Sequence, residues 1–319
     1  MAKQNKTFLD RLSGLFKTTA QLQRIVILSG VALVLLSASF GGYYYYDRYY
    51  QPQDTKVEQT LRMAEDAVEQ DPENPALRVD LAEKYLAFRK YEDAITMANS
   101  VLPALPDNER ILMVLGVANI LKGSPNDGIP YLEKYIGFYE NDDMVAFNKT
   151  FVAACYYLGD AYLMTEQPEK AVSILERGYK LNSADADLMY KLGVAYTKVK
   201  QYDAAKKILH QATLFVPDFK EVYQQLANVF SETKEPALEF YAKGMVAYCD
   251  KDYATALELL KSSVAEQTDS APTYNGLGMV YEAMNELLLA KENYEKALAL
   301  DPNYLSSANA LDRINTLLK

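Results

Sequence analysis

The stretch APTYNGLGMVYEAMNELLLAKENYEKALALDPNY, residues 271–304, decides the fold of this chain. It carries a small residue, Gly278, after Leu277 and a second small residue, Ala290, twelve positions later. The same spacing occurs at six places along the chain: Ala82 and Ala94, Gly116 and Gly128, Gly159 and Ala171, Gly193 and Ala205, Gly244 and Ala256, and Gly278 and Ala290. A spacing that recurs so often indicates an internal repeat.

This stretch resembles the tetratricopeptide repeat family, whose 34-residue unit is two antiparallel helices with small residues where the helices approach closely. Tyr274 stands where the family usually has tryptophan, and the remaining signature positions hold Leu277, Gly278, Tyr281, Ala290, Tyr294, Ala297 and Pro302. The resemblance implies an all-α fold. Residues 55–319 would form a right-handed α-solenoid of about six helix pairs with partial capping helices.

The units are predicted to begin near residues 75, 109, 152, 186, 237 and 271, at spacings of 34, 43, 34, 51 and 34 residues. The spacing of 43 leaves nine extra residues, around Asp142 to Thr150, for a longer helix or a loop between units. The spacing of 51 leaves a single extra helix near residues 220–233, interpreted as a first helix whose partner was lost. Residues 55–70 read as the second half of a unit, and residues 305–319 as a capping helix.

An uncharged segment precedes the repeats. Residues 25–46 carry no charge and, as a helix rising about 1.5 Å per residue, can cross a hydrocarbon core of about 30 Å. Residues 1–24 have a net charge of +4, which favours the cytoplasmic side, and residues 47–54 form a short linker. We therefore predict a single-pass membrane protein with a cytoplasmic N-terminus and an extracytoplasmic array, at the periplasmic or external face of the plasma membrane. Tyrosines at the far end of the span form a predicted membrane-interface belt: Tyr43, Tyr44, Tyr45, Tyr46, Tyr49 and Tyr50.

Alternatives to this topology remain open. Ser37-Ala38-Ser39 resembles a signal-peptide cleavage site. The apolar residues between Phe8 and Phe16 follow helical spacing, which predicts an interfacial helix on the inner leaflet, with a mobile basic tail as the alternative. The inverted topology would make the array a cytoplasmic receptor or regulator.

Composition argues against several classes of function. The formal net charge of −10 disfavours binding to nucleic acid. Cys155 and Cys249 are too few for a disulfide framework, and the single histidine, His210, belongs to no pattern with metal-ligand spacing. No glycine-rich phosphate loop or Gly-x-Ser-x-Gly motif occurs. We therefore predict that the protein is not an enzyme and uses no cofactor, metal or small-molecule substrate.

The family resemblance also implies where a partner binds. In the family, a groove is lined mainly by the second, fifth, ninth, twelfth and thirteenth residues of each unit's first helix. On this chain the implied groove residues are Met113, Val117, Tyr156, Asp160, Leu163, Tyr190, Val194, Tyr241, Met245, Tyr248 and Met279. Tyrosine and methionine suit adaptable apolar contact, so the expected ligand is an apolar or aromatic segment of another protein, such as an amphipathic helix.

Two functions fit these features. The first is a membrane-anchored scaffold that holds or assembles one partner protein at the extracytoplasmic membrane face. The alternative resembles the single-pass tetratricopeptide proteins that accompany the translocation channel, as a chaperone of emerging polypeptides. A scaffold should lose its partner when Tyr241 and Tyr248 are replaced by aspartate, whereas a chaperone should tolerate either change.

Overall fold

The computed structural model describes residues 56–139, 145 and 148–318. The segments predicted at 1–24, 25–46 and 47–54, with the tyrosine belt, lie outside the described residues. Within the described ranges, no helix has the length and apolar character needed to cross a membrane. Contacts between residues group Ala64–Lys319 into one compact unit.

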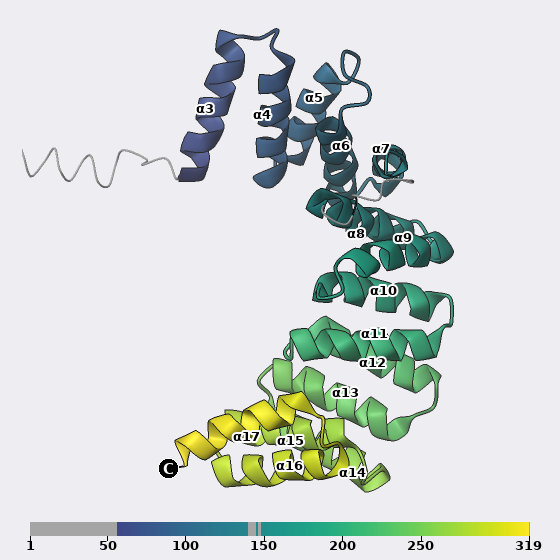
Figure 1. Ribbon diagram of the computed structural model, residues 1–319, viewed down its shortest axis with the longest axis vertical. Coiled ribbons are helices and arrows are strands. Elements are labelled where there is room, and N and C mark those ends of the chain that lie inside the picture. The colour runs from purple at the N-terminus through teal and green to yellow at the C-terminus, as the bar shows by residue number, and fades with distance from the viewer. Residues whose placement is uncertain (1–55, 140–144, 146–147, 319) are drawn as a thin grey trace, which may run out of the picture. The chain divides into compact units, whose positions relative to one another are not determined.

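The described part of the chain contains fifteen α-helices, which confirms the predicted all-α fold (Figure 1). Successive helices pack against each other along the array from α4 to α17. Their bounds are α3 Lys56–Gln70, α4 Pro75–Ala87, α5 Tyr91–Val101, α6 Glu109–Lys122, α7 Pro125–Gly137, α8 Lys149–Met164, α9 Pro168–Leu181, α10 Ala186–Lys198, α11 Tyr202–Phe215, α12 Lys220–Glu232, α13 Pro236–Cys249, α14 Tyr253–Glu266, α15 Ala271–Ala283, α16 Leu287–Leu300 and α17 Leu305–Leu317.

The helices form consecutive antiparallel pairs, and most of the first helices in these pairs have a short polar residue as N-cap. Asn108 caps α6 by accepting the N–H of Ile111 at 3.1 Å, and Asp185 caps α10 by accepting the N–H of Leu188 at 3.0 Å. Asn74, Asn148 and Ser270 cap α4, α8 and α15 in the same way. Each cap satisfies one of the backbone donors that the first turn of a helix leaves unpaired, so these residues fix where the first helices begin.

In most pairs the two helices are joined by the same three-residue turn, whose middle residue has a positive φ between 55° and 63°: Arg89, Glu166, Lys200, Lys234, Lys251 and Asn285. The N–H of the third residue donates to a carbonyl five residues earlier, as from Gln201 to Tyr196 at 2.8 Å. This arrangement closes the first helix in the manner of a Schellman motif. Helices α6 and α7 are joined by two residues, of which Gly123 has a φ of 93°.

Close approach of the two helices explains the small residues at the first repeated position. A Cβ added at Gly193 would lie 2.4 Å from Leu209, and one added at Gly159 would lie 2.4 Å from Leu175. In both pairs the large residue stands sixteen positions after the glycine, and the same contact occurs at Gly116, Gly244 and Gly278. A large side chain of the second helix therefore packs directly on the glycine of the first helix. We call this contact the lock.

The spacing of 43 residues leaves the contacts between neighbouring pairs unchanged. Tyr196 of α10 donates to Glu176 of α9 at 2.6 Å, twenty residues earlier. Tyr162 of α8 makes the same bond to Glu133 of α7 at 2.6 Å, twenty-nine residues earlier. The difference equals the nine extra residues, which lie between Gly137, where α7 ends, and Tyr162. Helix α8 begins at Lys149 and so takes up some of them.

The region after α11 departs from the pairing that we expected. We predicted a first helix without a partner at residues 220–233, but α12 packs against α13, and α13 packs in turn against α14. Both connections are the three-residue turn, with Lys234 in the first and Lys251 in the second. Helix α13 is therefore the second helix of one pair and the first helix of the next. We call α12, α13 and α14 the three-helix unit.

The sequence of α13 explains this double role. Towards α14 it presents Gly244, whose Cβ would lie 2.9 Å from Leu260 of α14, sixteen residues later. In α12 the equivalent small residue is Ala227. Sixteen positions later, in α13, stands Lys243, which is exposed and pairs with Glu239 at 2.6 Å. The lock between glycine and leucine is thus present between α13 and α14 and missing between α12 and α13.

Candidate partner-binding surface

The predicted groove residues divide into two sets by burial. All of them lie on the first helices α6, α8, α10, α13 and α15. The buried ones are Val117, Leu163, Tyr241 and Met245. The partly exposed ones are Met113, Tyr156, Asp160, Tyr190, Val194, Tyr248 and Met279. The second set supplies most of the accessible surface on these helices, whereas the first set belongs mainly to the apolar core.

Tyr241 and Met245 are core residues, which corrects their assignment to the groove. Their exposed fractions are 6% and 1%. The ring of Tyr241 stands edge-on to the ring of Tyr223 of α12 at 6.2 Å between centroids, and burial raises the pKa of its phenol well above the usual value. The cause is the three-helix unit, because α12 packs against α13 beside this part of the helix. Replacing Tyr241 by aspartate would therefore report on folding instead of on binding.

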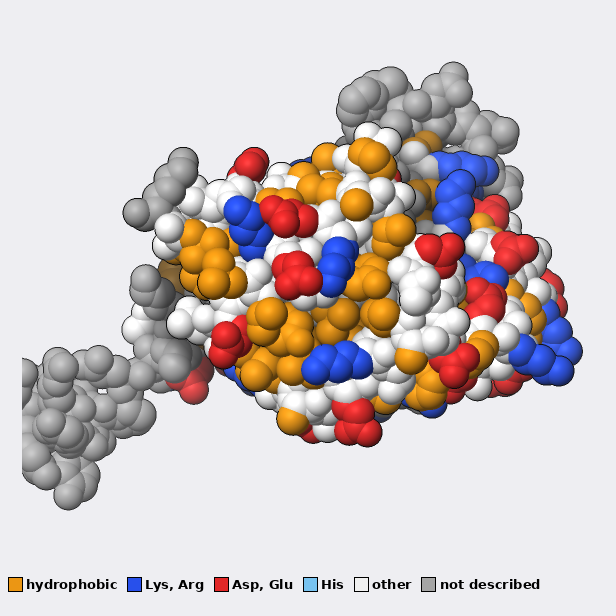
Figure 2. Space-filling view, turned by 90° about the horizontal axis from the view of Figure 1, so that it is seen from below, with side chains coloured by type: hydrophobic (Ala, Val, Ile, Leu, Met, Phe, Trp, Pro, Cys, Tyr) orange, Lys and Arg blue, Asp and Glu red, His pale blue; other side chains and the backbone are white. Residues whose placement is uncertain are grey.

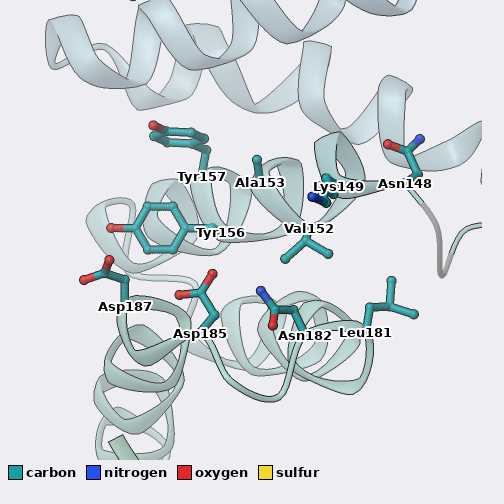
Figure 3. A pocket seen from close by; sticks show the side chains of 10 residues that line it. All are labelled: Asn148, Lys149, Val152, Ala153, Tyr156, Tyr157, Leu181, Asn182, Asp185 and Asp187. Carbon is teal, nitrogen blue, oxygen red and sulfur yellow. The ribbon is translucent and has the colours of Figure 1, made fainter. Parts of the chain in front are cut away.

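One predicted residue, Tyr156, lies in a cavity of about 760 Å³ between α8 and the start of α10 (Figure 3). We call it the tyrosine pocket. Its lining residues come from α8, from the end of α9 and from the start of α10: Asn148, Lys149, Val152, Ala153, Tyr156, Tyr157, Leu181, Asn182, Asp185 and Asp187. The other predicted groove residues are not among them.

The tyrosine pocket has an aromatic wall. The rings of Tyr156 and Tyr157 meet edge to face with 5.2 Å between their centroids. Burial, followed by the nearby carboxylates of Asp160 and Asp187, raises the pKa of Tyr156 to about 12. The phenol therefore stays neutral at physiological pH and offers a flat apolar face with one hydroxyl group at its edge.

Charge is unevenly placed around this wall. Figure 3 shows Asp185 and Asp187 beside Tyr156, with Lys149 beyond Val152 at the other end of the pocket. Asp185 is engaged as the cap of α10, whereas the exposed Asp187 has no charged partner in the described chain. The pocket thus combines an apolar floor with an available carboxylate at one end and an ammonium group at the other.

Next to this pocket, an ion pair fixes the floor between α8 and α10. Lys191 of α10 pairs with Asp160 of α8, and both side chains are 22% exposed. The ammonium group of Lys191 also lies 5.9 Å from the centroid of the Tyr156 ring, within the range of a cation–π contact. Asp160 is therefore an internal partner of Lys191, and the charge that we assigned to the groove at this position is neutralised.

Two further predicted residues, Tyr248 and Met279, meet in a second cavity of about 740 Å³. It joins the end of α11, at Leu214, to α13, α15, α16 and α17. Arg313 of α17 donates two hydrogen bonds of 2.8 Å to Glu282 of α15 across it. Figure 2 shows the array from the α14 to α17 end, where hydrophobic side chains lie among charged ones, and Leu288, Leu305 and Leu317 are exposed there.

Sequence reasoning missed several of these lining residues. Asp187 and Ala153 hold the second position of the predicted units that begin near residues 186 and 152, so the family's own rule for the groove points to both. Asp185 could be found as the capping residue before α10. Leu214 and Arg313 could not be found in this way, because only the folded array brings α11 and α17 to one cavity.

Comparison with known families decides the identity of the repeats. Two family models, both described as tetratricopeptide repeat, match residues 53–117 and 162–229 in one case and 271–304 in the other. The chain is a tetratricopeptide repeat protein. The repeats matched by sequence include the regular pairs α4–α5, α10–α11 and α15–α16.

Curated relatives share the repeats over most of this chain. The BBSome complex member BBS4 of Bos taurus is 24% identical over 267 residues, which are 80% of this chain and 46% of that protein. The DnaJ homolog subfamily C member 7 homolog of Dictyostelium discoideum is 22% identical over 237 residues, which are 72% of this chain and 40% of that protein. The chain spans less than half the length of these relatives.

Among solved structures, YrrB is similar in fold, and its structure is described as that of a TPR protein with an unusual peptide-binding site. It shows 16% identity and a TM-score of 0.51, over 62% of this chain and 97% of that one. Tetratricopeptide repeats are non-enzymatic modules that bind proteins or peptides, in agreement with the predicted class of function. The chain is therefore a scaffold for protein–protein interaction.

Proposed function

We propose that this protein is a membrane-anchored scaffold whose tyrosine pocket holds a segment of one partner protein at the extracytoplasmic membrane face. The observation that carries the binding part is the tyrosine pocket itself. It is a cavity of about 760 Å³ on the first-helix face, and the partly buried Tyr156 and Tyr157 line it. Cavities of this size accept a few large side chains and bury most of their surface.

The chemistry of the pocket favours one kind of segment. An apolar or aromatic side chain would pack on Val152, Tyr156 and Tyr157, where burial of apolar area supplies the free energy of binding. A lysine or arginine next to that side chain would face Asp187, whose carboxylate is unengaged among the described residues. An amphipathic helix with a basic edge meets both requirements.

Cross-linking tests the scaffold directly. A photoreactive p-benzoylphenylalanine replaces Tyr156 in the full-length chain in intact membranes, and the same residue replaces the exposed Lys261 of α14 as a control. We expect one dominant cross-linked partner from position 156 and none from position 261. A broad mixture of unrelated exported chains from position 156 would overturn the scaffold and favour the export chaperone.

A charge reversal then tests the basic edge. Asp187→Lys should weaken binding of the cross-linked partner about tenfold, because it places like charges together. Asp269→Lys is the matched control, since Asp269 is also exposed and lies next to the start of a first helix, α15. Equal binding by both variants would contradict a role for Asp187.

The membrane part of the proposal rests on residues 25–46, on the positive charge before them and on the tyrosines after them. Protease added to sealed spheroplasts tests it. We expect the array after residue 47 to be degraded and the N-terminal segment to be protected. Protection of the array would overturn the extracytoplasmic location, and release of the intact array from washed membranes would overturn the anchor.

A further inference from the structure

The three-helix unit forms a cavity that is separate from the tyrosine pocket. It has a volume of about 570 Å³, and we call it the α11–α13 cavity. Leu226 and Phe230 of α12 line it, together with Leu238 and Tyr241 of α13 and Pro272 of α15. Leu226, Phe230 and Tyr241 are each less than 9% exposed, so the cavity floor is part of the apolar core.

The irregular pairing accounts for this apolar floor. In the regular pairs a leucine or tyrosine of the second helix packs onto the small residue of the first, as Leu209 does onto Gly193. Helix α13 instead pairs the exposed Lys243 with the partly buried Glu239 and packs Gly244 onto α14. Tyr241 and Leu238 line the space beside α11 and α12.

Helix α11 supplies the polar side of the cavity and, within the described chain, one unpaired cation, Lys207. Lys206, Lys207 and His210 line the cavity, and no aspartate or glutamate is among its described lining residues. Lys206 is engaged with Glu235 at 2.8 Å and with Asp203 at 3.1 Å. Lys207 is exposed and has no ion pair in the described chain, so its ammonium group is available.

The body of the protein is acidic, so an unpaired cation beside an apolar floor is a local contrast. The whole chain has a net charge of −10, and residues 47–319 alone hold −14. A cavity with an apolar floor and an unpaired cation at its edge is complementary to a ligand with an apolar side and an anionic edge. The net positive N-terminal segment of this chain, residues 1–24, has the wrong charge for it.

We propose that the α11–α13 cavity is a second docking site, which binds an acidic amphipathic segment of a partner protein. Two or so large apolar side chains fill the floor formed by Leu226, Phe230 and Tyr241, and a glutamate or aspartate beside them pairs with Lys207. The site is independent of the proposed function of the tyrosine pocket.

Peptide binding to the full-length chain in lipid nanodiscs tests this site. The probe is a fluorescein-labelled synthetic helix with leucine and phenylalanine on one face and glutamate along the edge, and its twin carries lysine instead of glutamate. Empty nanodiscs correct for partition into lipid. We expect the acidic peptide to bind at least about tenfold more tightly than its twin, with an affinity that falls as salt rises.

Four variants locate the binding. Lys207→Glu should weaken the acidic peptide at least about tenfold, whereas Lys261→Glu, the same change on the exposed face of α14, should leave binding within about twofold. Leu238→Trp should weaken it about tenfold because the indole fills the cavity, and circular dichroism verifies that this variant is folded. Tyr156→Ala should have no effect, which separates this site from the tyrosine pocket.

Other results would overturn the proposal. Equal binding of the two peptides, or equal effects of Lys207→Glu and Lys261→Glu, would show that the charge of Lys207 does not favour the acidic peptide. Dodecanoate is the second probe. If it binds with a dependence on Lys207 and Leu238 while the acidic peptide does not bind, the cavity takes a fatty carboxylate instead of a protein segment.

Discussion

Helices α10 and α11 form a regular pair, whereas α12, α13 and α14 share one helix between two pairs. Both regions use the same turn, with Lys200 in the regular pair and Lys234 in the first turn of the three-helix unit. They differ in the contact between the helices. Gly193 receives Leu209, but Ala227 faces a cavity of about 490 Å³ that Lys243 also lines.

The difference shows that helix direction and close helix packing are determined by separate residues. A short turn with one left-handed residue makes consecutive helices antiparallel, whatever packs behind it. The choice of the close partner depends on a small residue on one helix and a large one sixteen positions later. Helix α13 has Gly244 in place for α14 and only Lys243 to offer α12, so it packs closely with α14 and leaves cavities beside α12.

The largest expected effect is the removal of a lock residue from the regular pair. Leu209→Ala should lower the free energy of unfolding by about 3 kcal/mol, because Leu209 is fully buried against Gly193. Lys243→Ala, at the equivalent position of α13, should cost less than about 0.5 kcal/mol. Urea denaturation followed by circular dichroism measures both. A similar loss for both variants would mean that α12 and α13 are locked as a regular pair.

Enlarging the small residue gives the second effect. Gly193→Val should cost about 2 kcal/mol, since its Cβ would meet Leu209 at 2.4 Å and the buried leucine has little space to move. Ala227→Val should cost less than about 1 kcal/mol, because its side chain extends toward the 490 Å³ cavity. Hydrogen exchange of α10 to α13 amides compares the two. Greater loss of protection at Ala227→Val would contradict the difference in packing.

Residue spacing was enough to predict the all-α fold and the repeat family. The glycines at the first repeated position stand at helix crossings, and Asn or Asp residues cap first helices where the chain pattern suggests a start. The double role of α13 could not be predicted, because its initial Pro236 occurs in first and second helices alike, as at Pro75 of α4 and Pro168 of α9, while Gly244 is typical of first helices.

The candidate site was harder to predict than the fold. The positional rule selected Tyr156, which lies on the wall of a cavity, and also Tyr241, which the extra helix α12 buries. A rule for one face of a helix holds only where its neighbours are regular. The α11–α13 cavity depends on the same irregularity. Its residues come from four helices, so it could not be predicted from any single segment of the sequence.

A smaller effect is expected from the hydrogen bonds that join neighbouring pairs. Tyr196→Phe should cost about 1 kcal/mol, because the hydroxyl group that bonds to Glu176 at 2.6 Å is lost. Tyr281 of α15 holds the same position, three residues after the glycine, but twenty residues before it stands Lys261 of α14 in place of a glutamate. Tyr281→Phe should therefore be neutral. If thermal denaturation showed equal losses of stability for Tyr196→Phe and Tyr281→Phe, the Tyr196–Glu176 hydrogen bond could not be the cause of the loss.

The smallest effect concerns two ion pairs, Glu282–Arg313 between α15 and α17 and Lys220–Asp250 in the three-helix unit, and in the first it depends on pH. Burial of Glu282 opposes its ionisation, but hydrogen bonds from Arg313 and Tyr294 outweigh burial and hold its pKa below the usual 4.5. The pair therefore stabilises the fold above about pH 4.5, and this stabilisation is lost as the pH falls through the lower folded pKa. Because the Arg313 side chain is 55% exposed, Arg313→Gln should cost less than about 1 kcal/mol at pH 7, and the cost should shrink below pH 4.5.

Lys220→Gln is the matched change in the three-helix unit, since Lys220 pairs with Asp250 at 2.6 Å on the surface. We expect no measurable pH-dependent loss from this variant, because solvent and salt screen an exposed pair of this kind. Unfolding curves of both variants between pH 3 and pH 7 decide the matter. A loss at Arg313→Gln that stays constant across this range would show that Arg313 acts by packing over α15 instead of by its charge, since protonating Glu282 would then remove nothing.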